Sequence, residues 1–329
     1  RYTALYEEME AKLRNGNAFE KIKAAQLFGA HKNPRFIRPL AEELNREIDD
    51  PIGKKMVHND PYVKAWIAWA LGTIGHPESL APLLTALEKT TKLMDEQKKS
   101  AAELEAKVQQ FYGSAEQRKE GRVVLSPDKP TPALLKSGYR FPMSPDLHWS
   151  TSDEFKGIAS PDDKNEEHAI RLQNYNYVNL ARRLLMSIAW LGNPESIESL
   201  RPYLAHESPY LRSAAALALE STKNRQAVVP LEERAGQEQD PVVQVYLNRA
   251  IVMLDKSKNK QLTQLLKTLR SDDLHIRVAS AHALDKLSLG ETVPALKEAY
   301  RIESHRIVRP ILASAIENAT RDNFIPVSN

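Results

Sequence analysis

Apolar residues recur along the chain with a period of about 32 residues, which is typical of repeat proteins. An aliphatic anchor, at or next to a basic residue in most copies, opens six successive segments, and the last five anchors follow one another at nearly equal spacing. The anchors are Val63, Leu180, Leu211, Val243, Ile276 and Val308. Seven residues after each anchor stands a small residue, which a bulky aliphatic follows, as in Ala250-Ile251. Small residues let two helix backbones approach and aliphatic residues fill the shared core, so this pattern predicts stacked helices.

Helix-start signals precede several anchors. Asp and Ser can accept hydrogen bonds from the first N–H groups of a helix, and Pro is tolerated in the first turn. The signals are Asp60-Pro61, Ser208-Pro209, Asp240-Pro241 and, without proline, Asp272-Asp273.

A turn and a second helix are predicted after each first helix. The stretch AWALGTIGHPESLAPLL at 68–84 is repeated in IAWLGNPESIESL at 188–200, with Gly75 aligned to Gly192. We interpret both as inter-helix turns in which glycine supplies a permissive backbone and proline restrains the next helix. The second helices open with aliphatic pairs three residues apart, such as Leu80/Leu83.

The combined pattern resembles the HEAT repeat family, especially the short bacterial HEAT-like repeats also found in phycobilin lyase subunits. It reads Asp-Pro-x-Val-Lys/Arg, then Ala-Leu-Gly, then Pro-Glu-Ser-x-x-Pro-Leu, and it is best preserved in Asp60–Leu87. The resemblance covers roughly 17–92 and 174–320, although the unit at 174–205 lacks the Asp-Pro start. It implies an all-α fold, a right-handed α-solenoid of HEAT-like helix pairs in an armadillo-like superhelix.

One large insertion interrupts the repeats. The gap between the first two anchors, Val63 and Leu180, exceeds one repeat period by about 85 residues. Residues 79–112 contain Pro82 as their sole proline and have no glycine, which predicts a long helix whose extension covers 93–112. Residues 113–173 are rich in proline, and we predict a non-helical excursion there. The expected domains are 1–92 and 174–329, both HEAT-like repeats, with the insertion 93–173 between them.

Composition limits the chemistry. Hydrophobic residues make up 42% of the chain and charged residues 27%, with a net charge of +3 and no cysteine. The lack of cysteine excludes disulfides, thiolate metal sites and cysteine nucleophiles. No apolar run reaches the roughly 20 residues that span a bilayer. The chain begins at Arg1, from which we expect a trimmed N-terminus, and we favour a bacterial periplasmic or extracytoplasmic location over the cytoplasm.

Catalytic and metal-binding patterns are weak. His275 and His282 share a helix face but lack carboxylate partners there, so we expect no metal site and no cofactor. The adjacent pairs Glu42-Glu43 and Glu232-Glu233 point apart on a helix, and we interpret them as solvated faces. Trp66, Trp69 and Trp190 stand at helical spacing, which favours packing.

Basic residues recur in the second helices. Arg201, Arg234, Lys267 and Arg301 follow one another at nearly equal spacing, yet they stand one, three, two and five residues after their own helix leucines. They therefore share no face, which argues against a basic stripe for nucleic acid. We keep these four as candidate partner-binding residues, together with aromatic residues of the insertion, namely Tyr139, Phe141, Trp149 and Phe155.

The predicted function is a non-catalytic binding scaffold or adaptor. Its partner would be another protein or a peptide, held on the concave face, by the insertion, or by both. One alternative is a lyase-like or ligand-binding subunit that handles a small molecule, for which a pocket with Tyr, Trp and an acidic residue would argue. The others are a nucleic-acid-binding HEAT protein and a structural role in which the long helix pairs with a second copy.

Overall fold

The fold is all-α, as predicted. The computed structural model describes residues 2–46, 61–112 and 166–321, with side chains in 4–46, 61–96 and 177–321. These residues form helices and short turns, and no strand occurs among them. They group into two compact units, one of residues 2–46, 61–70, 81–112 and 166–184, the other of residues 71–80 and 185–321.

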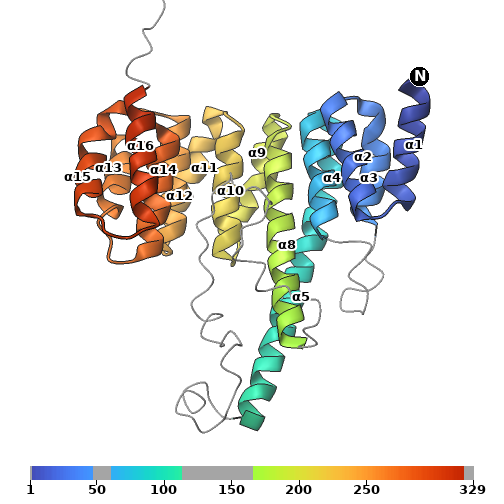
Figure 1. Ribbon diagram of the computed structural model, residues 1–329, viewed down its shortest axis with the longest axis horizontal. Helices are drawn as coiled ribbons and strands as arrows, with labels where there is room; N and C mark the ends of the chain where they lie inside the picture. The colour runs from blue at the N-terminus through green and yellow to red at the C-terminus, as the bar shows by residue number, and fades with distance from the viewer. Residues whose placement is uncertain (1, 47–60, 113–165, 322–329) are drawn as a thin grey trace, which may run out of the picture. The chain divides into compact units, whose positions relative to one another are not determined.

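The first unit contains the N-terminal helices (Figure 1). Helix α1 packs against α2 and α3, and Phe28 stacks on Phe36 with ring centroids 4.0 Å apart. A Cβ on Gly29 of α2 would lie 3.0 Å from the Cα of Ala70 in α4, so glycine is required for this close approach. The helices are α1 (Tyr2–Asn15), α2 (Ala18–His31), η1 (Pro34–Phe36), α3 (Ile37–Asn45), α4 (Pro61–Ile74), α5 (Leu80–Tyr112) and α8 (Glu166–Ala189).

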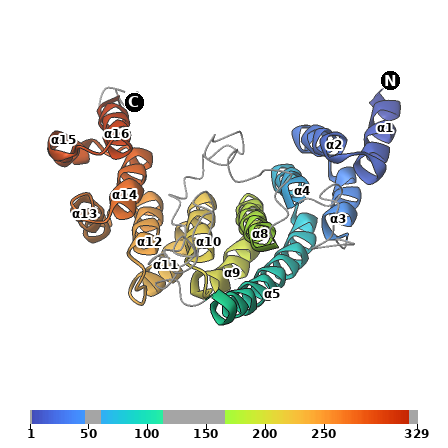
Figure 2. The same ribbon diagram turned by 60° about the horizontal axis from the view of Figure 1, so that its bottom comes forward.

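The second unit is a stack of helix pairs. The first helices pack in the order α10, α12, α14 and α16, and the second helices α11, α13 and α15 pack on them (Figure 2). The helices are η2 (Pro77–Ser79), α9 (Pro194–Leu200), η4 (Arg201–Ala205), α10 (Pro209–Ser221), η5 (Arg225–Ala227), α11 (Val228–Ala235), α12 (Pro241–Leu254), α13 (Asn259–Thr268), α14 (Leu274–Leu287), η6 (Gly290–Thr292), α15 (Val293–Ile302) and α16 (Val308–Arg321).

The predicted core positions are buried. The small residue and aliphatic that follow each anchor have no exposed surface in α10, α12 and α14, as in Ala250-Ile251. Ile316 of α16 is half-buried. The predicted turn glycines Gly75 and Gly192 have φ of 71° and 68°, the left-handed region that favours glycine.

Two of the four predicted helix starts are confirmed, one is wrong, and Asp60 of the fourth lies outside the described residues. Asp240 accepts hydrogen bonds from the N–H groups of Val242 and Val243, and Asp273 from that of His275. The hydroxyl of Ser208 makes no such bond, so its predicted capping role is wrong. Arg212 instead holds this loop, through carbonyls described below.

The insertion begins as predicted and ends earlier. Helix α5 runs without interruption from Leu80 to Tyr112. Helix α8 begins at Glu166, inside the segment 113–173 that we predicted to be non-helical. The last proline of the insertion is Pro161, and the residues after 165 are good helix formers, which explains the earlier start. The predicted domain limits remain a prediction.

Candidate functional site

One basic position recurs near the start of the first helices in the second unit. It directly follows the aliphatic anchor and holds Arg212 in α10, Arg277 in α14 and Arg309 in α16. In each case Nη1 donates to carbonyl oxygens of the chain before the helix, one of which, for Arg309, belongs to Tyr300 near the end of α15. Arg212, for example, binds the carbonyls of His206 and Glu207 at 2.9 Å each. The arginine thus fixes each loop to the helix that follows it.

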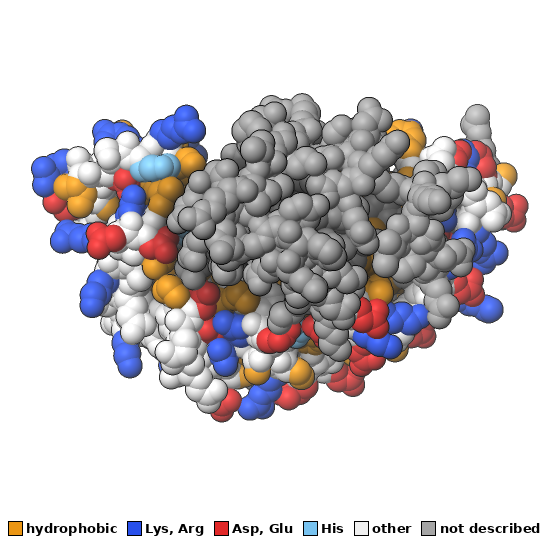
Figure 3. Space-filling view, turned by 90° about the horizontal axis from the view of Figure 1, so that it is seen from below, with side chains coloured by type: hydrophobic (Ala, Val, Ile, Leu, Met, Phe, Trp, Pro, Cys, Tyr) orange, Lys and Arg blue, Asp and Glu red, His pale blue; other side chains and the backbone are white. Residues whose placement is uncertain are grey.

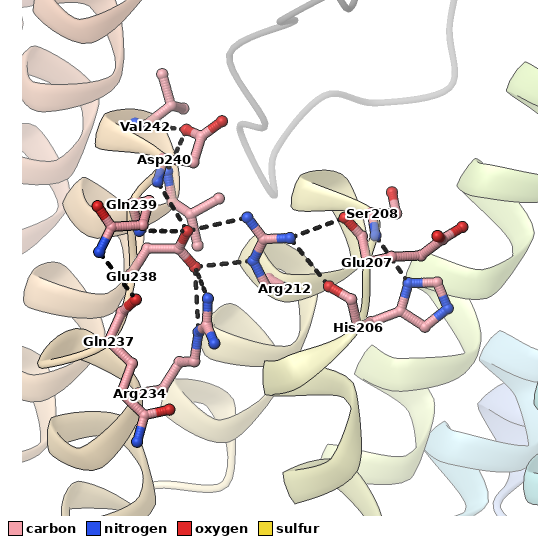
Figure 4. Close-up of polar contacts among 11 residues, drawn as sticks. His206, Glu207, Ser208, Arg212, Arg234, Gln237, Glu238, Gln239, Asp240 and Val242 are labelled. Carbon is pink, nitrogen blue, oxygen red and sulfur yellow. Dashed lines mark hydrogen bonds and ion pairs between the residues drawn. The ribbon is translucent and has the colours of Figure 1, made fainter.

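The same side chain also reaches the loop of the next repeat. Nε and Nη2 of Arg212 donate to the two carboxylate oxygens of Glu238, at 2.8 and 2.9 Å (Figure 4). Glu238 lies between α11 and α12, and Nη2 of Arg234 on α11 donates to it at 2.8 Å. The Glu238 side chain is 1% exposed. We call this arrangement of a first-helix arginine and the next loop's glutamate a closed junction.

The charge on Glu238 is strongly stabilised. Burial alone would raise its pKa, but hydrogen bonds from Arg212, the backbone N–H of Asp240 and Arg234 outweigh that effect. The pKa of Glu238 is lowered from 4.5 to about 2. The carboxylate is therefore ionised at any physiological pH, and the closed junction is a permanent ion pair.

A second closed junction lies two helix pairs further on. Nε of Arg277 donates to Oε2 of Glu303 at 2.8 Å, and Oε1 of Glu303 accepts from the N–H of His305 at 2.8 Å. Burial opposes ionisation of Glu303, yet the His305 N–H and Arg277 lower its pKa. In both closed junctions the arginine and the glutamate are 26 residues apart.

The junction between these two lacks both charged groups, and we call it the open junction. Gln244 of α12 stands at the arginine position, directly after the anchor Val243. Ser271 stands at the glutamate position, six residues before Arg277, just as Glu303 stands six residues before Arg309. The Ser271 hydroxyl accepts a hydrogen bond from the N–H of Asp273 at 3.2 Å. An ion pair across two repeats is thus replaced by an amide and a hydroxyl.

A hollow of about 380 Å³ occupies the open junction. It lies between α12 and α13 and the loop that leads into α14. Its lining is Gln244, Val245, Asn248, Gln264, Lys267, Thr268, Arg270 and Ser271.

A chain of amides orients the wall of the hollow. Nε2 of Gln244 donates to Oδ1 of Asn248 at 3.5 Å, and Nδ2 of Asn248 donates to Oε1 of Gln264 at 3.1 Å. Asn248 is 3% exposed and fixed by both neighbours, whereas Gln264 is exposed. Because the chain runs in one direction, the terminal Gln264 NH₂ keeps its hydrogen atoms available, with no partner among the described residues.

The rim of the hollow carries positive charge. Lys267 is exposed on α13 and forms no ion pair within residues 4–46, 61–96 and 177–321. Arg270 is close enough to Glu298 to help lower the pKa of that carboxyl, whose main partner is Arg301. No carboxylate or imidazole is among the residues that line the hollow. The arrangement suits binding by hydrogen-bond donors and charge rather than acid–base chemistry.

The four predicted basic residues have different surroundings. Arg201 pairs with Glu233 at 3.0 Å, Arg301 pairs with Glu298 at 2.9 Å, and Arg234 belongs to the first closed junction. Lys267 alone of the four lines the hollow. On the face shown in Figure 3, positive and negative side chains are interspersed outside the grey atoms. The structure therefore places one of the four at the hollow.

The other predicted residues divide between packing and undescribed segments. Tyr139, Phe141, Trp149 and Phe155 lie outside the described residues. Among the tryptophans of the first helices, Trp66 and Trp69 meet edge to face at 5.6 Å between centroids, and Trp190 is 36% exposed. Within the described side chains, no group of three or more His, Asp or Glu is placed to hold a metal ion.

The sequence pattern did not predict the closed and open junctions. Gln244, Ser271, Glu238 and Glu303 were not singled out. A comparison of the residues that directly follow the anchors shows that Gln244 stands where other repeats have arginine. The glutamate position, in contrast, lies in loops that the repeat pattern does not align. In the first unit, Glu43 is 3% exposed and pairs with the buried Lys21, so its interpretation as a solvated residue is wrong. Lys21, four residues after the Asn17 cap, pairs with Glu43 and stabilises the buried carboxylate.

Comparison with known families confirms the repeat type. A profile described as HEAT repeats matches residues 169–251, and one described as the PBS lyase HEAT-like repeat matches residues 63–89. The resemblance to HEAT repeats is thus confirmed, including the short type found in phycobilin lyase subunits. No curated protein matches the chain significantly.

Solved structures match most of the chain, but with low sequence identity and low TM-scores. The complex of CpcE and CpcF of phycocyanin lyase from Nostoc sp. PCC7120 is 13% identical, with a TM-score of 0.45, over 95% of this chain and 94% of that one. An engineered protein from the Northeast Structural Genomics Consortium is 14% identical, with a TM-score of 0.26, over 96% of both chains. None of the described helices is long and apolar enough to cross a membrane.

Proposed function

We propose that this chain of HEAT repeats is a non-catalytic binding scaffold that holds a protein or peptide partner. The observation that carries the proposal is the open junction. The repeats on either side close this position with an ion pair, whereas here a hollow of about 380 Å³ is left between α12 and α13. Stability alone would favour the closed arrangement, so the departure from it supports a role for this position in contact with another molecule.

The hollow suits binding because its walls are fixed in advance. The amide chain from Gln244 through Asn248 to Gln264 holds one wall, and Arg277 holds the loop on the other side through the carbonyls of Ser271 and Asp272. A partner that enters a fixed site loses its own freedom but requires little ordering of the scaffold. HEAT repeats expose extended surfaces of this kind because each repeat packs mainly on its neighbours.

A lyase-like role is the second candidate, favoured by the PBS lyase HEAT-like match at residues 63–89. Lys64 in this segment has its pKa lowered to about 8 by burial and by the charge of Lys89, which makes part of the amine neutral near neutral pH. The hollow contains no tyrosine, tryptophan or acid, the lining that would favour chromophore handling. Absorbance titration of the chain with a free bilin tests this role, and we expect no spectral shift.

The insertion and the long helix keep their predicted roles as hypotheses. Partner contact through residues 113–165 is tested by deleting that segment and measuring partner affinity. Pairing of two copies through α5 is tested by light scattering on the isolated chain.

Site-specific photo-crosslinking in the source cells tests the scaffold proposal. A photoreactive amino acid placed at Gln264, in the hollow, is compared with one at Lys297, which is exposed on α15 in the next repeat. We expect a discrete adduct from position 264, identified by mass spectrometry and reproduced with the purified partner, and none from 297. Identical adducts from both positions, or no adduct from 264, would contradict a scaffold that binds here.

A further inference from the structure

We propose that the hollow at the open junction is an anion site that receives a carboxylate from outside the chain. The carboxylate would take the place that Glu238 and Glu303 fill in the two closed junctions. The inference rests on the proposed function for one point, that the carboxylate belongs to an Asp or Glu side chain of a protein partner.

The first argument is the missing side chain. In the closed junctions the loop before the next helix supplies its own carboxylate, 1% exposed in Glu238 and 9% exposed in Glu303. Ser271 stands at the same loop position, but its side chain ends after one carbon and a hydroxyl. The volume of about 380 Å³ beside it is enough for a carboxylate and the atoms that carry it.

The second argument is that the groups around the hollow are donors. Lys267 and Arg270 carry N–H groups and positive charge, and Gln264 presents an NH₂ group that the amide chain leaves free. The Ser271 oxygen accepts from Asp273, so its own hydrogen can be donated. Thr268 takes no part, because its hydroxyl lies between the Leu265 carbonyl and Ser280. These donors share the lining of one hollow that contains no carboxylate, which favours an anion.

The third argument is a base without a carboxylate at the equivalent position. Lys267 precedes Ser271 by four residues, as Arg234 precedes Glu238. Arg234 pairs with that glutamate, whereas the residue four positions after Lys267 is a serine. Of the acids nearby, Asp273 accepts from the N–H of His275 and Glu298 pairs with Arg301, while Asp272, directly after Ser271, is exposed. An incoming carboxylate would restore the pairing that the neighbouring repeat makes internally.

Fluorescence anisotropy on the full chain tests the inference. The probe is a fluorescein-labelled peptide of alternating Asp and Gly, and its control is the same peptide with Asn for Asp. The variants are Lys267→Gln, the filled site Ser271→Glu, and Lys297→Gln as a matched loss of charge on α15. Glutarate and inorganic phosphate serve as unlabelled competitors, which separates a small acid from an acidic peptide as the source of the carboxylate.

We expect the Asp peptide to bind and the Asn peptide not to bind. Loss of Lys267 should weaken the affinity about tenfold, since a hydrogen bond to a charged group contributes about one such factor. Ser271→Glu should abolish binding while it raises the unfolding temperature, which shows that the loss is not misfolding, and Lys297→Gln should change the affinity less than about twofold.

Three results would overturn the inference: equal binding of the two peptides, equal effects of Lys267→Gln and Lys297→Gln, or undiminished binding to Ser271→Glu. Binding of glutarate without binding of the peptide would assign the site to a small acid. The crosslinking experiment at Gln264 does not depend on charge. An adduct there, together with peptide affinity that Lys267→Gln leaves unchanged, would therefore leave the scaffold standing and reject the anion site.

Discussion

The first closed junction and the open junction occupy equivalent places in consecutive repeats, and they differ in how the place is filled. Arg212, Glu238 and Arg234 fill it with buried charge from the chain itself. Gln244, Ser271 and Lys267 leave a hollow with the same net charge of +1, because each set of three keeps one uncompensated base. The comparison indicates that the repeat can exchange internal stability for a binding site without a change of charge.

Removal of the closed-junction carboxylate should give the largest effect. Glu238→Gln leaves Arg212 and Arg234, 13% and 19% exposed, without their counter-charge. We expect a loss of about 2–3 kcal/mol in the free energy of unfolding, between the values for exposed and fully buried pairs. Urea unfolding followed by circular dichroism measures it.

The matched control for this substitution lies in the same repeat. Glu233→Gln breaks the Arg201–Glu233 pair, whose side chains are 51% and 55% exposed. Its effect should stay below about 0.5 kcal/mol. If the two glutamines destabilise the chain equally, the closed junction is not a special source of stability.

Acid should weaken the closed junction over a defined range. The pKa of Glu238 is about 2 in the folded chain and 4.5 ordinarily. Above 4.5 both folded and unfolded forms are ionised and the ion pairs contribute fully. As the pH falls from 4.5 towards 2, the unfolded chain takes up a proton that the folded chain does not, so stability falls. Across this window the unfolding midpoint should therefore fall less steeply with pH in Glu238→Gln than in the unchanged protein. Parallel curves of midpoint against pH would contradict the role of Glu238.

Conversion of the open junction into a closed one should give a small gain in the free energy of unfolding. Gln244→Arg with Ser271→Glu should raise the free energy of unfolding by about 1 kcal/mol, the value of a partly exposed, hydrogen-bonded pair. Gln244→Arg alone should give no gain, because the arginine would lack its carboxylate. A double-mutant cycle measures the coupling between the two changes. Strictly additive single effects would show that the two positions do not meet as their counterparts do.

The sequence predicts the repeat architecture of this protein better than its candidate site. The repeat period, the buried pairs of a small and an aliphatic residue and the glycine turns follow from local rules on helix packing and backbone freedom, and the structure confirms them. The junctions depend on contacts between a helix and a distant loop, 26 residues along the chain, and nothing in the local pattern of Glu238 distinguishes it from a solvated glutamate. Lys267 was predicted for its spacing, yet its importance comes from Ser271, which the spacing does not reveal.

Arg277 belongs to two junctions at once, and this has a consequence for how the chain unfolds. Its Nη1 holds the loop of the open junction and its Nε binds Glu303 in the next closed junction. In a linear array each interface between repeats is a separate coupling energy, and the weakest coupling divides the array into cooperative blocks. We expect hydrogen exchange to show α14 to α16 opening as one block, bounded by the open junction. A molecule bound in the hollow would then supply the coupling that the open junction lacks, and α14 to α16 would open together with the rest of the stack.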